Sequence, residues 1–167
     1  MRQVFFSFEY KKDAWRASQI RNMNVVSNDS TFSDNDWEEV KSKDEKVIEK
    51  WIKDQMEMRS CIVVLIGEST ASRKWVKYEI EQAYKMNKGM VGIYINKLED
   101  QNGNQSGRGK NPFDYVYANN GTKLSNYIEC YESDHLTSKY VYDDIKQNIE
   151  ELIEYAIENK APRNMLF

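Results

Sequence analysis

The run "CIVVLIG", Cys61 to Gly67, constrains the fold more than any other stretch of this sequence. Its residues before the glycine are apolar without interruption, and most of them are β-branched. Such a run is typical of a strand that is buried on both faces in a parallel sheet. The run is far too short to cross a bilayer as a helix, so we expect no membrane span.

Two other apolar segments, 3–8 and 90–96, are predicted to be buried strands, and 126–132 is predicted to be an edge-like last strand. The remaining segments are predicted helices at 13–26, 42–56, 72–87 and 140–160, and long loops at 27–37 and 97–123. Alternation of strands and helices indicates an α/β domain. We predict a single flavodoxin-like, three-layer domain over residues 1–167, with a mainly parallel sheet of four or five strands and helices on both faces.

The apolar spacing within the predicted helices indicates which side chains should be buried. They are Trp15, Ile20 and Met23 in the first helix, Val47 and Trp51 in the second, with Ile48 and Ile52 as further candidates, and Ile145, Ile149, Leu152 and Ala156 in the last. At the start of the second helix, Ser42 and Glu45 fit a capping box, in which each side chain satisfies a free backbone N–H group.

Charge and cysteine content exclude several classes of function. The net charge is -3, so no overall basic field favours nucleic acid. Cys61 and Cys130 show no spacing typical of a metal site or a disulfide. The N-terminal stretch "MRQVFFSFEYKKD" turns polar too soon for a signal peptide. We therefore expect a cytoplasmic protein without a bound metal, and without nucleic-acid or membrane partners.

The predicted helix "SRKWVKYEIEQAYKMN", 72–87, begins with three cations, Arg73, Lys74 and Lys77. A helix dipole disfavours positive charge at this end. A bound phosphate would reverse that effect, because backbone N–H groups and cations would both face an anion. Ordinary solvated cations at a helix start explain the pattern equally simply. Both interpretations stay open on the sequence alone.

Trp75 and Glu79 lie one turn apart in the same helix, at the edge of its apolar stripe. Ligands of open α/β sheets bind at the carboxyl ends of the strands. Three segments should meet at that edge: the turn after Phe8, the loop before Ser42, and the segment "GESTAS", 67–72, which precedes this helix. Trp75 and Glu79 are therefore expected to form the wall of a cleft.

Five segments of the chain resemble those of a known family. The segments "VFFSFEY", "DNDWEEVK", "WVKYEIEQA", "GIYIN" and "GKNPFDYV" resemble TIR domains, and more narrowly the TIR subunit of the Thoeris antiphage defence system. The resemblance covers 2–116, while 127–160 matches only as a terminal strand and helix. In catalytic TIR domains, a Trp-x-x-x-Glu helix supplies the essential glutamate, which falls here on Glu79. The first-strand pattern of the family ends in a Ser-aromatic pair, matched by Ser7 and Phe8. Many TIR enzymes have basic residues next, whereas this chain has Glu9 and Tyr10.

The resemblance implies an enzyme that cleaves the nicotinamide–ribose bond of NAD+, an NAD+ nucleosidase and ADP-ribosyl cyclase. Its product would be a cyclic ADP-ribose isomer that activates a separate effector in antiviral defence. NAD+ would be the substrate, with no separate cofactor. A phage-derived trigger and assembly into a homo-oligomer are further expectations from the family.

One carboxylate is enough for this chemistry. Nicotinamide in NAD+ is cationic and departs neutral, so Glu79 needs only to stabilise the developing oxocarbenium charge. The predicted substrate-binding residues are Ser7, Phe8, Asp36, Trp37 and Trp75. Their aromatic rings would exclude water and stack on a base, while Asp36 would orient a ribose hydroxyl or cap the following turn.

Other interpretations compete with this one. Arg16 and Arg21 would contact phosphates or, more simply, be solvated surface cations. The segment "GRGKNPFDY", 107–115, is expected to be a structured loop that borders the pocket or a protein contact. For the whole chain, a non-catalytic TIR interaction module is the alternative, in which Glu79 would be replaceable. A phosphoacceptor receiver ranks last, because the first strand offers only Glu9 as an acid.

Overall fold

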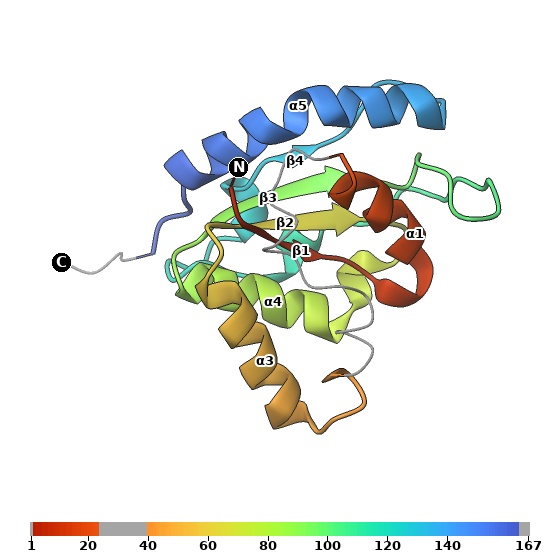
Figure 1. Cartoon of the computed structure of the whole chain (residues 1–167). Coiled ribbons are helices and arrows are strands. Elements are labelled where there is room, and N and C mark those ends of the chain that lie inside the picture. Colours follow the sequence, from red (N-terminus) through yellow and green to blue (C-terminus); the bar gives the residue numbers. More distant parts are fainter. Residues whose placement is uncertain (1, 24–39, 164–167) are drawn as a thin grey trace.

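The computed structural model describes residues 2–23 and 40–163 of the chain (Figure 1). The strands are Val4–Ser7 (β1), Cys61–Ile66 (β2), Gly89–Tyr94 (β3) and Cys130–Tyr131 (β4). The α-helices are Tyr10–Arg21 (α1), Glu45–Glu57 (α3), Lys74–Lys85 (α4) and Ser138–Glu158 (α5). Single 3-10 turns are Thr70–Ser72 (η2), Pro112–Tyr115 (η3) and Leu124–Asn126 (η4).

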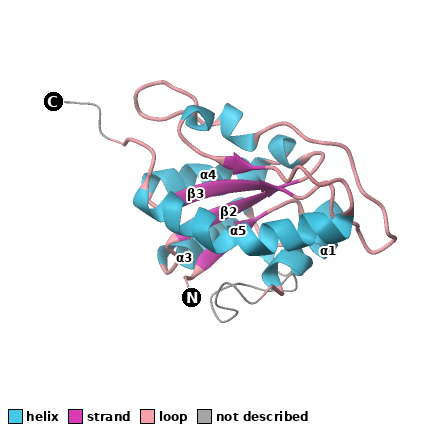
Figure 2. Ribbon diagram, turned by 90° about the horizontal axis from the view of Figure 1, so that it is seen from above, coloured by secondary structure: helices cyan, strands magenta, loops and turns pink. Residues whose placement is uncertain are grey.

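The sheet of the described residues has four parallel strands in the order β1-β2-β3-β4. Helices α1 and α5 cover one face, and α3 and α4 cover the other (Figures 1 and 2). Successive residues of a strand point to opposite faces, so Phe5 packs with α3 and α4, whereas Phe6 packs with α1 and α5. Both faces are covered, which is why β2 is apolar throughout and fully buried. The predicted three-layer α/β fold is confirmed.

Helix α1 differs from its prediction on one face. It begins at Tyr10, and its buried residues are Asp13, Arg16, Ala17 and Ile20. Ile20 and Met23 are buried as predicted, but the prediction for Trp15 is wrong, because its side chain is 53% exposed. An ion pair between Asp13 and Arg16 occupies the inner side of the helix instead. An apolar pattern could not anticipate that a charged pair would be buried here.

Helix α3 begins two residues later than the predicted capping box requires. Its N-cap is Asp44, whose Oδ1 accepts a hydrogen bond from the Val47 amide at 3.1 Å. The capping box of Ser42 and Glu45 was therefore a wrong prediction. The buried stripe consists of Ile48, Ile52 and Met56, the first two of which were candidates. Val47 is exposed, and Trp51 is only partly buried against the core.

The C-terminal elements follow the prediction closely. Strand β4 lies within the predicted segment 126–132 but is shorter, and it pairs in parallel with β3. Along α5, the residues Ile145, Ile149, Ile153 and Ala156 are buried against the sheet, while Leu152 is partly buried. Within the described ranges, no helix is long and apolar enough to cross a membrane. The same ranges contain no group of three or more His, Cys, Asp or Glu residues that could hold a metal ion.

The segment 97–123 is structured by close packing over the end of β2. A Cβ atom at Gly109 would lie 2.0 Å from the carbonyl oxygen of Gly67. The amide of Gly107 donates a hydrogen bond to Glu68 Oε1 at 3.2 Å. The side chain of Asn111 accepts a hydrogen bond from the amide of Phe113, which is fully buried. The prediction of a structured loop over 107–115 is confirmed.

The close approach of Gly109 to the Gly67 carbonyl predicts that Gly109→Ala destabilises the protein by about 1–3 kcal/mol, the usual range for overpacking. The new methyl group would meet backbone, which cannot rotate away. Urea unfolding followed by circular dichroism would measure the change. Lys110→Ala, at the exposed neighbouring position, is the control and should have little effect. Equal stability of the two variants would show that the loop does not pack on Gly67.

Candidate active site

A pocket of about 360 Å³ lies where the turn after β1 meets the start of α4. This is the carboxyl end of the sheet, where open α/β folds bind ligands. Its apolar lining consists of Phe6, Phe8, Tyr10, Trp75 and Val76. Its charged lining consists of Glu9, Glu79, Lys11, Lys41, Arg73 and Lys74. The pocket therefore combines aromatic surface with charges of both signs.

Glu79 reaches the pocket from the second turn of α4 and is only 5% exposed. Ser7, the last residue of β1, donates a hydrogen bond from its Oγ to Glu79 Oε1 at 2.6 Å. Burial disfavours the charged carboxylate and raises the pKa of Glu79 to about 8, although the Ser7 hydrogen bond acts in the opposite direction. Ser7 and Glu79 are 72 positions apart in the sequence, and the fold brings their side chains into hydrogen-bonding contact.

Aromatic side chains line the pocket together with this carboxyl group. Phe8 is buried and stacks on Tyr10, with ring centroids 4.6 Å apart. Trp75 packs edge-on against Tyr78 at 5.6 Å between centroids. Phe8 and Trp75 both line the pocket with Glu79. The structure thus brings together four predicted site residues, since Ser7 joins the group through its hydrogen bond.

Two of the predicted site residues and one predicted loop are not part of the described pocket lining. Asp36 and Trp37 fall outside the described residues, so their roles remain predictions. The segment 107–115 contributes no residue to the described pocket lining, and the prediction that it borders this pocket is not supported.

Both early arginines make contacts that the sequence did not indicate. Arg16 is buried rather than solvated: its NH1 lies 2.8 Å from Asp13 Oδ1, and its Nε donates to the Leu98 carbonyl at 2.7 Å. Arg16 therefore anchors the start of the 97–123 segment. The Arg21 guanidinium lies 5.5 Å from the centroid of the Phe8 ring, a cation–π contact behind the pocket wall.

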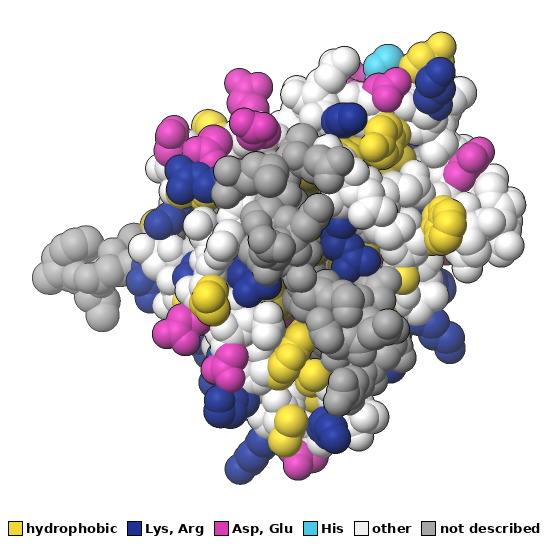
Figure 3. Space-filling view, in the orientation of Figure 1, with side chains coloured by type: hydrophobic (Ala, Val, Ile, Leu, Met, Phe, Trp, Pro, Cys, Tyr) yellow, Lys and Arg dark blue, Asp and Glu magenta, His cyan; other side chains and the backbone are white. Residues whose placement is uncertain are grey.

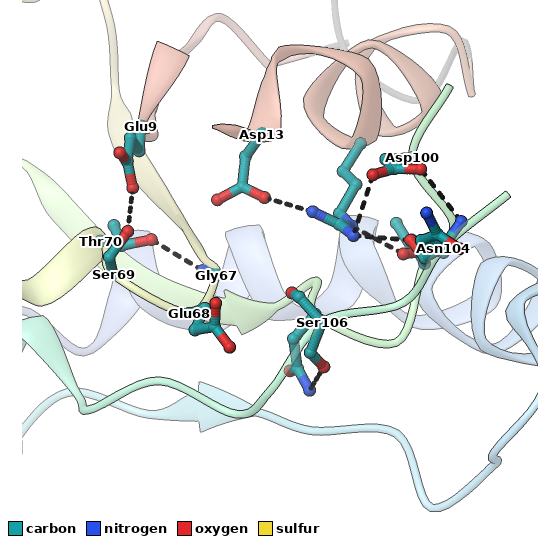
Figure 4. A network of polar contacts seen from close by, with 12 residues as sticks. Glu9, Asp13, Gly67, Glu68, Ser69, Thr70, Asp100, Asn104 and Ser106 are labelled. Carbon is teal, nitrogen blue, oxygen red and sulfur yellow. Dashed lines mark hydrogen bonds and ion pairs between the residues drawn. The ribbon is translucent and has the colours of Figure 1, made fainter. Parts of the chain in front are cut away.

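Glu9 is a site residue that the sequence indicated only as a departure from the family pattern and as the single acid near the first strand. It is 5% exposed, and it follows β1 by two residues. Figure 4 shows its carboxylate directed at Ser69, on the turn after β2, which donates a hydrogen bond to Glu9 Oε2. The other oxygen, Oε1, lies 3.3 Å from Arg73 Nε. An acidic residue directly after the apolar run 3–8 was the available signal for this position.

Two of the three cations at the start of α4 form ion pairs with carboxylates. Arg73 pairs with Glu9, and Lys74 pairs with Glu45 at the start of α3. Lys74 also lies over the Trp75 ring, with its Nζ 5.0 Å from the centroid. Neighbouring carboxylates therefore offset the unfavourable dipole interaction. Both side chains remain more than half exposed and still line the pocket.

The buried carboxyl of Glu79 predicts an unusual dependence of stability on pH. The folded protein keeps a proton up to a pKa of about 8, whereas an ordinary glutamate loses it near 4.5. The free energy of unfolding should therefore fall as pH rises through this window, because the unfolded chain binds fewer protons. Glu79→Gln removes this effect. The free energy of unfolding of the variant, taken relative to that of the wild type, should rise by on the order of 3 kcal/mol between pH 5 and pH 9.

Denaturant unfolding at several pH values would measure this difference. Glu150→Gln, which changes an exposed glutamate of α5, is the matched control and should track the wild type at every pH. A constant difference between Glu79→Gln and wild type from pH 5 to pH 9 would contradict the buried, protonated carboxyl.

Comparison with known proteins gives two concordant matches. Residues 5–100 match the family model described as "Thoeris protein ThsB, TIR-like domain". A relative from Bacillus cereus (strain MSX-D12), named "Putative cyclic ADP-D-ribose synthase ThsB1", is 34% identical over 134 residues, which cover 75% of this chain and 70% of the relative. The matched range 5–100 includes Ser7, Phe8, Trp75 and Glu79. The chain therefore belongs to the TIR-like domain family of Thoeris protein ThsB.

Proposed function

We propose that this protein cleaves the nicotinamide–ribose bond of NAD+ and closes the product into a cyclic ADP-ribose isomer, a signal in antiphage defence. The observation that carries the proposal is the buried Glu79 carboxyl, held by Ser7 in a pocket walled by Phe8 and Trp75. The name of the Bacillus cereus relative, "Putative cyclic ADP-D-ribose synthase ThsB1", supports the choice of product. NAD+ is then a substrate, and no separate cofactor is needed.

In the cleavage step, the electron pair of the C–N bond leaves with nicotinamide, which departs as a neutral molecule. Positive charge develops on the ribose, and the ionised Glu79 carboxylate stabilises it across a short distance in a water-poor site. The cationic nicotinamide ring favours the ionised form of Glu79 when NAD+ binds. Ser7 fixes one carboxylate oxygen by its hydrogen bond.

Closing the ring requires that a hydroxyl of the same molecule reach the ribosyl cation before water does. Phe8 and Trp75 supply apolar walls that exclude water and give a base a surface for stacking. The attacking hydroxyl forms the new C–O bond and loses its proton, which the Glu79 carboxylate accepts. The released cyclic nucleotide would then activate a separate effector protein. A phage-derived trigger and assembly of several copies are further parts of this proposal.

The first test is replacement of Glu79. Glu79→Gln and Glu79→Ala should each reduce NAD+ cleavage more than 100-fold, because the charge that stabilises the transition state is lost. Mass spectrometry of nucleotides, with purified protein and in phage-infected cells, would measure nicotinamide and the ADP-ribose product. Glu150→Gln should keep wild-type activity. The proposal fails if infected cells carrying wild type and Glu79→Gln contain equal amounts of both products.

The second test is the pH dependence of kcat/KM. The active form has an ionised Glu79, so kcat/KM should rise with pH, about tenfold per unit, and level off near the Glu79 pKa of about 8. Ser7→Ala removes a hydrogen bond that lowers this pKa, and it should move the midpoint upward. A profile that is flat from pH 6 to pH 9, or a midpoint that moves downward in Ser7→Ala, would contradict the assigned role of the carboxylate.

A non-catalytic TIR interaction module is the second candidate. The observation in its favour is a group of exposed tyrosines in and after the 97–123 segment: Tyr115, Tyr117 and Tyr127. Exposed aromatic surface is typical of protein contacts. In that case defence would survive Glu79→Gln and would be lost when these tyrosines are replaced by alanine.

A further inference from the structure

Cations are concentrated at the mouth of the Glu79 pocket, although the chain as a whole carries a net charge of -3. Lys11 comes from α1, Lys41 from the segment before α3, and Arg73 and Lys74 from the start of α4. Figure 3 shows Lys and Arg side chains near the middle of this face of the molecule and also along its lower edge. Such an arrangement favours an anionic ligand at this opening.

We propose that Arg73 contacts the diphosphate of the dinucleotide. Glu9 is the positioning residue, which holds the Arg73 guanidinium in place for this contact. This inference rests on the proposed function and deepens it, because it assigns the diphosphate-binding side of the same pocket. It accounts for a feature that Glu79 leaves unexplained: a second buried carboxylate, directed at a cation on the pocket rim.

Glu9 is well placed to hold Arg73. It is buried, its Oε2 accepts a hydrogen bond from Ser69, and its Oε1 lies 3.3 Å from Arg73 Nε. Ser69 is itself fixed, because Thr70 Oγ1 accepts a hydrogen bond from the Gly67 amide at 2.7 Å and closes the turn after β2. The Glu9 carboxylate therefore links the ends of β1 and β2 to Arg73, the N-cap residue of α4.

Arg73 keeps hydrogen-bonding capacity for a ligand. The contact with Glu9 uses Nε, and Arg73 makes no other ion pair among residues 2–23 and 40–163. Its side chain is 52% exposed and lines the pocket. A guanidinium group has five donors in a planar fork, which suits phosphate oxygens. One edge held by Glu9 leaves the terminal NH₂ groups for the diphosphate.

The start of α4 adds backbone donors on the same side. This helix of 12 residues has no side-chain hydrogen bond at its N-cap, Arg73. The first amides of a helix lack intrahelical partners and favour anions. Lys74, Trp75 and Val76, the first residues of α4, all line the pocket. Arg73 and these amides would therefore face the same phosphate groups, while Glu79 lies one turn further along the helix.

Binding of ADP-ribose, measured by titration calorimetry on the full chain, tests Arg73 without relying on turnover. Arg73→Ala should weaken ADP-ribose binding about 10- to 30-fold, in line with the loss of a charge-assisted hydrogen bond. Adenosine, which lacks the diphosphate, should bind the variant and wild type equally. Lys77→Ala removes the same charge from an exposed position of α4 outside the pocket lining, and it should bind ADP-ribose as wild type does.

A double-mutant cycle tests Glu9. With Arg73 present, Glu9→Gln should weaken ADP-ribose binding, because the guanidinium is no longer held. In the Arg73→Ala background, Glu9→Gln should leave binding unchanged or strengthen it, because an unpaired carboxylate repels the diphosphate. A purely structural role for Glu9 would weaken binding in both backgrounds. Circular dichroism of each variant checks that it is folded.

Each outcome is decisive. The inference is overturned if wild type does not bind ADP-ribose, if Arg73→Ala binds it as tightly as wild type, or if adenosine binding falls by the same factor. If ADP-ribose binding depends on Arg73 but NAD+ is never cleaved, the diphosphate site stands and the proposed enzymatic function fails.

Discussion

The hydrogen bond between Ser7 and Glu79 connects the end of a buried strand to the side of a helix, and the rest of the site depends on it. It places a carboxyl group where water is scarce, at the open edge of a parallel sheet. A buried carboxyl without a cation partner is costly when ionised. Among the described residues Glu79 has Ser7 as its hydrogen-bond partner and forms no ion pair. The fold therefore holds a group that gains most from a positively charged ligand.

The two glutamates of the pocket have opposite surroundings. Glu9 lies between Ser69 and Arg73, so a cation balances its charge. Glu79 lies among aromatic and aliphatic side chains, and its pKa is raised to about 8. Paired acidic residues whose surroundings differ in this way commonly have different roles at one site. Under the proposed function, Glu9 would organise the diphosphate side of the pocket, and Glu79 would face the charge that develops on the ribose.

Much of the fold followed from the sequence. Apolar runs located β1, β2 and β3, and helical spacing located α4 and α5. The meeting of Phe8, Trp75 and Glu79 was predictable too, because strand ends and the following helix starts share one edge of a parallel sheet.

What could not be predicted involves polar pairing over long distances. Nothing in the periodicity of α1 shows that Asp13 and Arg16 would be buried as a pair while Trp15 faces solvent. Asp44 caps α3 although Ser42 and Glu45 fit the better-known pattern. Glu9 accepts a hydrogen bond from Ser69 and pairs with Arg73, both about 60 residues away in the sequence. Partners of this kind depend on how strands lie side by side, which local spacing does not encode.

The most direct test of this account is the titration of the Glu79 carboxyl itself. Carbon NMR of protein with labelled glutamate, assigned by comparison with Glu79→Gln, would follow its side-chain carbon from pH 4 to pH 10. The account predicts a midpoint near 8, far above the ordinary value of 4.5. A midpoint close to that ordinary value would mean that Glu79 is solvated, and it would contradict the buried carboxyl on which the site is built.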